Sequence, residues 1–330
     1  SVFYEEANKY YIDITDDLTF LSDKKHFIWS SEKEGFNQLY LMNMDGKQSV
    51  KLTTGSYDVT TFYGVDEKNK KIYFQAEEKS PLNKQIFSVD LDGKNLVNLT
   101  PSLSGCNSAQ FSSTFDYFIN NHSTINTAPT YTVYDRFGKK VRTIEDNVNY
   151  PKIQEEYGVS PVEFFTFTTS ENVKLNGWMI KPRDFNPTRK YPVFMTQYSG
   201  PGSQSVLDRW NGTSYWWNQM IAQAGYIVVC VDGRGTGGRG EEFKKMTYLQ
   251  LGHYETIDQI ETAKYMGTLP YVDKARIGIF GWSYGGYMSS LCILKGNDVF
   301  KSAIAVAPVT NWKWYDSVYT ERYMRTTDEN

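Results

Sequence analysis

Cysteine and histidine are both scarce in this sequence, with three of each among 330 residues. Three dispersed cysteines are too few for a disulfide framework, and their spacing is not that of a zinc site. The formal net charge is only −3, so the sequence offers no basic surface for nucleic acid. No hydrophobic run reaches the length of a membrane span. We therefore expect no metal, no cofactor and no nucleic-acid partner.

Aromatic residues are abundant by contrast, at 16% of the chain with 25 tyrosines, and the length is sufficient for two domains. Short strands separated by turns fill the first part, whereas strands alternate with helices in the second. Pro151, Gly158 and Pro161 lie where the pattern changes and indicate a linker. We therefore predict one domain over residues 1–150 and another over residues 151–330.

The first domain contains a repeat of about 46 residues, marked by Gly46, Gly93 and Gly138. The first two of these glycines follow aspartate between alternating strands, which is typical of hairpin turns. A period of this size is typical of β-propeller blades and predicts about three of them. Three blades cannot close a ring, so either the propeller is partial or the domain is a plain antiparallel sandwich.

The second domain alternates apolar strands with helical segments, which predicts a parallel sheet with helices on both faces. This order is that of an α/β-hydrolase. The expected strands cover residues 163–168, 174–180, 191–198, 226–232, 277–280 and 301–307, and the expected helices cover residues 215–224, 253–266 and 288–294.

The most informative stretch is Gly281-Trp-Ser-Tyr-Gly285, which follows the buried strand 277–280 and precedes a helical segment. Strand, G-x-S-x-G turn and helix form a nucleophile elbow, which presents a serine hydroxyl above the sheet edge. Glycine is needed beside Ser283, because side chains there would collide with neighbouring elements. The N–H of Tyr284 would face a developing oxyanion. A chance match in a glycine-rich chain is the alternative.

A serine nucleophile needs a histidine base and an acid, and in α/β-hydrolases both follow the serine in the chain. His26, His122 and His253 all precede Ser283, and we interpret them as structural or surface residues. None of the acids after Ser283 can be assigned to a triad. We therefore expect the chain to be truncated before its catalytic aspartate and histidine and to be nearly inactive alone.

These motifs resemble the prolyl oligopeptidase family of serine peptidases, most closely the dipeptidyl peptidase IV branch of the Bacteroidetes type. The first half resembles the end of that family's propeller, so the likeness covers essentially the whole chain. The matching stretches are Gln197–Gln204, Val231–Gly237, Gly281–Tyr287, Val306–Trp312 and Tyr315–Met324.

The resemblance implies that Ser283 is the nucleophile, and that the Tyr198 hydroxyl and the Tyr284 N–H form the oxyanion hole. It also implies an apolar pocket for a proline ring, since flat aromatic walls suit a compact ring. The alternative is that these aromatic residues are ordinary residues of the hydrophobic core. The residues implied for the pocket are Tyr315, Tyr319, Val309 and Trp312.

Two further features are left without a catalytic role. Glu5 and Glu6 look like the glutamate pair with which this family holds a substrate's amino terminus, but that pair lies earlier in the propeller. Asp232 and Arg234 resemble a structural loop near the site.

The resemblance implies release of Xaa-Pro or Xaa-Ala dipeptides through an acyl-enzyme. It further implies a full-length homodimer exported to a bacterial periplasm by a signal outside these residues. One alternative is an acylaminoacyl peptidase or oligopeptidase of the same family. The other is a non-catalytic interaction protein built from a propeller and a dead hydrolase domain.

Overall fold

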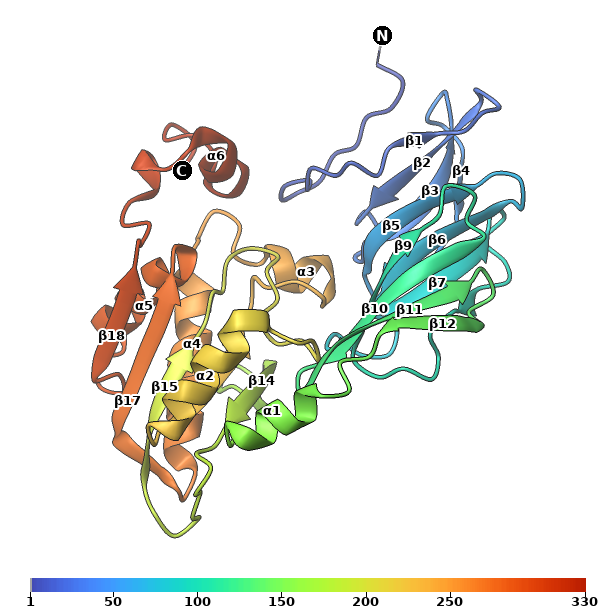
Figure 1. Ribbon diagram of the computed structural model, residues 1–330. Helices are drawn as coiled ribbons and strands as arrows, with labels where there is room; N and C mark the ends of the chain where they lie inside the picture. Colours follow the sequence, from blue (N-terminus) through green and yellow to red (C-terminus); the bar gives the residue numbers. More distant parts are fainter. Residues whose placement is uncertain (1) are drawn as a thin grey trace. The chain divides into compact units, whose positions relative to one another are not determined.

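The computed structural model describes residues 2–330, which form two compact units (Figure 1). The first unit contains the chain up to Tyr150 together with residues 207–210 and 238–242. The second contains residues 151–206, 211–237 and 243–330.

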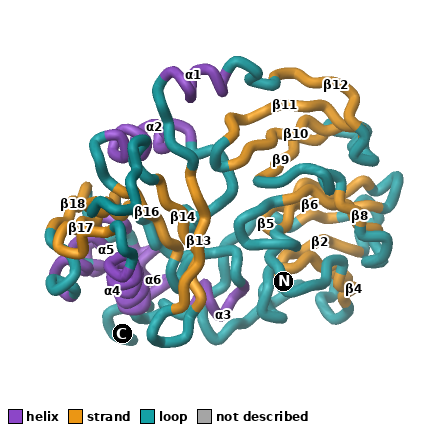
Figure 2. Tube along the Cα trace, turned by 90° about the horizontal axis from the view of Figure 1, so that it is seen from below, coloured by secondary structure: helices purple, strands orange, loops and turns teal. Residues whose placement is uncertain are grey.

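The first unit consists of three four-stranded antiparallel sheets, each following the last along the chain (Figure 2). Within each sheet the strands pair in chain order, as in propeller blades. The predicted partial propeller of three blades is confirmed. The strands are β1 (Thr19–Phe20), β2 (His26–Ser31), β3 (Gln38–Asn43) and β4 (Ser49–Lys51); β5 (Val59–Asp66), β6 (Lys71–Ala76), β7 (Gln85–Asp90) and β8 (Val97–Asn98); and β9 (Cys106–Phe111), β10 (Tyr117–Thr124), β11 (Thr127–Asp135) and β12 (Lys140–Glu145).

The three repeat glycines close equivalent turns between the third and fourth strands of the blades. Each has a positive φ, of 66°, 78° and 79° for Gly46, Gly93 and Gly138. A Cβ on Gly93 would lie 2.7 Å from the carbonyl oxygen of Lys51, and one on Gly138 would lie 2.5 Å from that of Leu99. The turns at Gly93 and Gly138 therefore need glycine for two reasons: the backbone conformation, and the close approach to the preceding blade.

The middle blade is buried on both faces, as strand periodicity requires when a sheet lies between two others. Ile72 and Phe74 of β6 belong to a core shared with Ile28 of the first blade. Tyr73, between them in the chain, points the other way into a core with Phe118 of the third blade. Successive residues of one strand thus join two cores.

The second unit is built on one six-stranded sheet in the order β13-β14-β16-β15-β17-β18. The strands are β13 (Val162–Thr168), β14 (Lys174–Ile180), β15 (Tyr191–Thr196), β16 (Ile227–Asp232), β17 (Val272–Trp282) and β18 (Ser302–Val306).

The expectation of a parallel sheet is only partly right, because β14 pairs antiparallel with both β13 and β16. A short loop without a helix joins β13 to β14, and such a connection permits only an antiparallel pair. The pairs among β15, β16, β17 and β18 are parallel.

Helices cover both faces of this sheet (Figures 1 and 2). Helix α2 (Gly212–Gln223) packs on β14 and β16, while α4 (His253–Thr268) and α5 (Tyr284–Lys295) pack together on β17. Across residues 2–330, no helix has the length and apolarity to cross a bilayer.

Four short helical elements are not among the helices that the sequence predicts. Helix α1 (Tyr150–Glu156) occupies the predicted linker, and α3 (Gly240–Lys245) follows β16 in the chain. The 3₁₀ turn Trp312–Trp314 and α6 (Ser317–Met324) lie after β18. Such short segments carry too few turns for an apolar periodicity to be recognised in the sequence.

Replacing Gly93 by alanine should destabilise the first unit by about 1–3 kcal/mol, because the added Cβ would meet the backbone of Lys51. The matched control is Gly35→Ala, where φ is 92° but the space is open, so only the backbone strain applies. Urea unfolding followed by tryptophan fluorescence measures both. Equal losses for the two variants would contradict the close contact between blades.

Candidate active site

Ser283 forms the turn between β17 and α5, with φ 56° and ψ −114°. Residues with side chains seldom adopt a positive φ, so neighbouring groups must hold this conformation. The Ser283 N–H donates to the carbonyl of Val306 in β18 at 2.9 Å, and the Tyr287 N–H donates to the Ser283 carbonyl at 3.0 Å. The predicted strand, sharp turn and helix are therefore all present.

The glycines around Ser283 lie where any side chain would strike backbone. A Cβ on Gly281 would collide with the carbonyl of Gly285. A Cβ on Gly285 would lie 2.5 Å from the carbonyl oxygen of Gln197, and one on Gly286 would lie 2.7 Å from that of Val306. The turn is thus enclosed by β17, α5, β18 and the loop after β15.

The loop after β15 fixes the position of Tyr198. Gln197 donates from Nε2 to the Gly285 carbonyl at 2.8 Å, and its Oε1 accepts from the Ser199 hydroxyl at 3.0 Å. The Tyr198 side chain is 39% exposed, and its ring centroid lies 6.1 Å from that of Tyr284. Burial, with a smaller contribution from Tyr315, raises the pKa of Tyr198, so its hydroxyl stays a hydrogen-bond donor at neutral pH.

Tyr284 is the first residue of α5, where backbone N–H groups lack partners within the helix. Its side chain is only 2% exposed, and its hydroxyl donates to Oε1 of Glu255 at 2.5 Å. Burial raises the pKa of Glu255 to about 7, because desolvation outweighs the hydrogen bonds that the carboxylate accepts.

Aromatic rings extend from Tyr284 towards the end of the chain. Trp312 lies 5.5 Å from Tyr284 and stacks on Tyr319 at 5.7 Å, measured between ring centroids. Tyr315 meets both Trp312 and Tyr319 edge to face, at 5.8 and 5.3 Å. Five of the predicted site residues therefore form one group of contacting rings, the aromatic wall, which includes the residue after Ser283; they are Tyr198, Tyr284, Trp312, Tyr315 and Tyr319. Val309 is half-buried in the loop that leads from β18 to this wall.

Glu255 and Gln197 are site residues that sequence reasoning did not identify. Glu255 lies in the first turn of α4, where an acid is ordinarily explained by helix capping. It does accept from the Gly252 N–H at 3.0 Å, as a capping residue would. Its second contact, with Tyr284, joins residues 29 positions apart and has no signature in the sequence.

The loop after β16 is held by buried charge. Arg234 and Asp258 form a buried ion pair, with 2.7 Å between Nη2 and Oδ1, and the Arg234 backbone N–H also donates to Asp258 at 2.7 Å. Asp232 accepts from the backbone N–H groups of Ser205 and Val206 at 2.9 and 2.8 Å. These contacts hold the backbone of the loop after β16 to α4 and to the segment at Ser205–Val206.

Two of the three histidines contact polar groups in the first unit, and the third is exposed. His26 contacts Asp23 at 2.6 Å, and His122 contacts the Ser104 carbonyl at 2.8 Å, both within the first unit. His253 is exposed at the start of α4, with its ring against Tyr254.

Among residues 2–330, no group of three or more His, Cys, Asp or Glu side chains could hold a metal ion. Cys106, Cys230 and Cys292 are buried and unpaired with one another. Burial raises the pKa of Cys106 to about 11 and that of Cys292 to about 12, so these thiols stay protonated. Cys230 and Cys292 are small residues of the core of the second unit.

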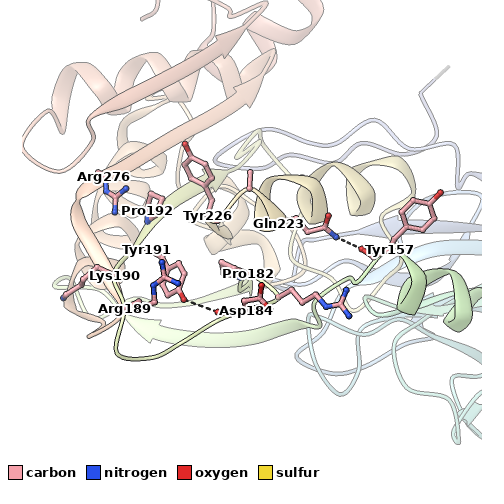
Figure 3. A pocket seen from close by; sticks show the side chains of 13 residues that line it. Tyr157, Pro182, Asp184, Arg189, Lys190, Tyr191, Pro192, Gln223, Tyr226 and Arg276 are labelled. Atoms are coloured by element: carbon pink, nitrogen blue, oxygen red, sulfur yellow. Dashed lines mark hydrogen bonds between the residues drawn. The ribbon is translucent and has the colours of Figure 1, made fainter.

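A cavity of about 640 Å³ lies elsewhere in the second unit (Figure 3). Its wall includes Tyr191, which begins β15, and Tyr226, which precedes β16. Ser283, by contrast, follows the carboxyl end of β17, where open α/β sheets bind their ligands. The cavity is thus at the other end of the sheet from Ser283. Its basic residues are Arg183, Arg189, Lys190 and Arg276.

Comparison with known proteins gives consistent matches for both units. Residues 212–330 match the Prolyl oligopeptidase family, and residues 1–129 match the Dipeptidyl peptidase IV (DPP IV) N-terminal region. The crystal structure of Porphyromonas gingivalis dipeptidyl peptidase 4 superimposes with a TM-score of 0.90 at 46% sequence identity, covering 95% of this chain and 44% of that chain.

Fungal relatives also match most of the chain. The chain is 38% identical over 309 residues to the "Probable dipeptidyl-aminopeptidase B" of Arthroderma otae, and 39% identical over 305 residues to that of Penicillium rubens. Each match covers 90% of this chain and 33% of the relative. The chain therefore spans about a third of the length of these relatives.

Gly285→Ala should destabilise the second unit by about 1–3 kcal/mol, since the new Cβ would lie 2.5 Å from the Gln197 carbonyl oxygen. The matched control is Gly267→Ala, another helical glycine, whose Cβ would meet only the Lys274 Cβ at 3.3 Å. There the higher helix propensity of alanine should make the change neutral or stabilising by up to about 1 kcal/mol. Thermal unfolding of the two variants checks the difference, and a stable Gly285→Ala protein would be inconsistent with the packing described.

The raised pKa of Glu255 should make stability depend on pH. Its ordinary pKa is 4.5, so its contribution is complete below that value and is lost as pH rises through about 7, where the folded protein also ionises. Relative to Glu255→Gln, the wild type should lose about 2–3 kcal/mol between pH 5 and 8. Urea unfolding of both proteins at the two pH values measures this.

Glu261→Gln is the control, because the hydrogen bond from the Ser170 N–H lowers the pKa of Glu261. Its contribution is therefore present above its ordinary pKa and should be constant between pH 5 and 8. A pH-independent difference between wild type and Glu255→Gln would show that Glu255 is already ionised at pH 5.

Proposed function

Because the chain belongs to the prolyl oligopeptidase family of serine peptidases, we propose that it is the nucleophile-bearing part of a dipeptidyl peptidase. The enzyme releases Xaa-Pro or Xaa-Ala dipeptides from the amino termini of peptides. The observation that carries this proposal is the convergence of the strained turn at Ser283 with two polar donors and one aromatic wall.

In this proposal the Ser283 hydroxyl attacks the carbonyl carbon of the second substrate residue. The carbonyl oxygen becomes an oxyanion, which accepts hydrogen bonds from the Tyr198 hydroxyl and the Tyr284 N–H. The proton of the Ser283 hydroxyl passes to the general base and from it to the amine, which leaves as the C–N bond breaks; water then hydrolyses the acyl-enzyme on Ser283. The Tyr198 hydroxyl is protonated at neutral pH, and the raised pKa that partial burial causes is consistent with this donor role.

The aromatic wall is proposed to select the second substrate residue. Trp312, Tyr315 and Tyr319 present flat surfaces at right angles or in a stack, and Val309 adds an aliphatic side chain nearby. A proline ring or an alanine methyl group can pack against such surfaces, which offer no space for a long side chain in this proposal.

The general base and the triad acid are proposed to come from a segment outside these 330 residues. Two observations support this. His26 and His122 have partners in the first unit and His253 is exposed at the start of α4, and the relatives are longer than this chain. Residues 1–150 then correspond to the C-terminal blades of the propeller and residues 151–330 to the start of the peptidase domain. Without its base, a serine nucleophile loses several orders of magnitude in rate.

The names of the relatives favour a dipeptidyl peptidase over an acylaminoacyl peptidase or oligopeptidase of the same family. The likeness to the Porphyromonas enzyme supports a bacterial origin, for which we propose a periplasmic location and a homodimeric full-length protein.

Hydrolysis of Gly-Pro-arylamide tests the proposal. The full-length product should turn over this substrate, and Ser283→Ala should abolish turnover. The 330-residue chain should be slower by several orders of magnitude, because it lacks the base. Full turnover by the 330-residue chain would refute the claim that the base lies outside it.

The non-catalytic alternative is tested separately with a fluorophosphonate probe. The full-length product should be labelled at Ser283, and the Ser283→Ala variant should not. A full-length product that is neither labelled nor active would support the alternative, a non-catalytic interaction protein with an inactive hydrolase domain.

A further inference from the structure

Glu255 is a buried carboxylic acid that contacts the residue after Ser283. Its side chain is 1% exposed and lies in the first turn of α4. Burying an ionisable group is unfavourable unless its polar atoms are satisfied, and both oxygens of Glu255 are. Oε1 accepts from the Tyr284 hydroxyl at 2.5 Å, and Oε2 accepts from the Gly252 N–H at 3.0 Å.

These two hydrogen bonds connect the beginnings of two helices. Gly252 immediately precedes α4, and Tyr284 is the first residue of α5. Gly252 also lies close to α5, because a Cβ there would collide with the Tyr287 side chain. Glu255 therefore ties α4 to the residue that follows Ser283.

The Tyr284 side chain is restrained on its other sides by rings. Tyr287 meets it edge to face at 5.6 Å, and Trp312 lies 5.5 Å away. With its hydroxyl held by Glu255, the side chain cannot turn without breaking a buried hydrogen bond. The Ser283–Tyr284 peptide shares that Cα, so its orientation is restrained as well.

This restraint acts on a peptide that has little intrinsic preference for its conformation. Ser283 is held at φ 56° and ψ −114°, and the ψ angle sets the direction of the Tyr284 N–H. An oxyanion donor is effective only if it already points at the developing charge. An anchor on the Tyr284 side chain supplies that orientation.

We propose that Glu255 is a positioning residue for the reaction at Ser283, holding the Tyr284 N–H in its oxyanion-binding direction through the Tyr284 hydroxyl. This inference rests on the proposed function of Ser283 and Tyr284. It adds a residue from another helix that touches neither the nucleophile nor the substrate.

The same carboxylate could instead serve only to stabilise the packing of α4 against α5. The two roles differ in what they do to catalysis by folded protein. Loss of packing lowers the amount of folded enzyme, whereas loss of positioning weakens the transition state relative to the bound substrate.

The experiment compares Glu255→Ala, Glu255→Gln, Tyr284→Phe and the double variant Glu255→Ala/Tyr284→Phe in the full-length product, with active sites titrated. Glu255→Ala and Tyr284→Phe should each lower kcat about tenfold with KM changed less than about twofold, a part of the ~10²–10³ lost when such a donor is removed. The double variant should be no slower than either single variant, because both break one hydrogen bond. Glu255→Gln, whose amide oxygen can still accept, should retain most of kcat.

A second readout separates transition-state from ground-state binding. A dipeptide boronic acid, which forms a tetrahedral adduct on Ser283, should bind about tenfold more weakly to Glu255→Ala, while the product dipeptide should bind unchanged. The control is Glu261→Ala, the same substitution six residues further along α4, where the carboxylate accepts from the Ser170 N–H. It should leave kcat and both inhibitors unaffected.

Wild-type kcat in Glu255→Ala or Tyr284→Phe, additive losses in the double variant, or equal weakening of both inhibitors would overturn the role of Glu255. If Glu255→Ala does not fold, Tyr284→Phe breaks the same hydrogen bond from the other side and decides the question. An inactive wild type would contradict the proposed function. An active wild type with unaffected variants would contradict only the role of Glu255.

Discussion

The positive φ at Ser283 is the constraint around which the second unit is arranged. A serine in this conformation cannot rely on local preference, so it depends on backbone groups that approach from three sides. Gly281, Gly285 and Gly286 permit that approach, because each faces a carbonyl at a distance that a side chain would prevent. The strand order brings β15 and β18 to either side of β17, and these strands or the loops after them supply the carbonyls of Gln197 and Val306.

The aromatic wall depends on the same turn. Tyr284 follows Ser283, and its ring begins a series of contacts that passes through Trp312 to Tyr315 and Tyr319. Tyr198 joins from the loop after β15, whose backbone lies against Gly285. Rings from three separate segments therefore meet at one place. This gives an apolar surface and hydroxyl donors together, a combination that tyrosine provides well.

The first unit is organised by repetition instead of by one strained residue. Each blade buries a face against the next, and Gly93 and Gly138 let their turns approach the preceding blade. Such neighbour-to-neighbour packing explains why three blades form a compact unit even though they do not make a ring. The interfaces use alternate residues of the same strand, as Ile72 and Tyr73 show.

The sequence alone determined the features that are written in local patterns. The blade repeat, the alternation of strands and helices, and the G-x-S-x-G turn each depend on residues close together in the chain, so they could be predicted. The antiparallel pairing of β14 with its two neighbours was not predicted, because strand direction depends on the short connection from β13 to β14 and on the strand order, which the alternation of strands and helices does not give. Likewise, the resemblance named Trp312, Tyr315 and Tyr319, but their contact with Tyr284 is a property of the folded chain. Glu255 is the clearest case. In the sequence it is an ordinary helix-capping acid, and only the packing of α4 against α5 brings its carboxylate to Tyr284, because a hydrogen bond across 29 residues leaves no local trace.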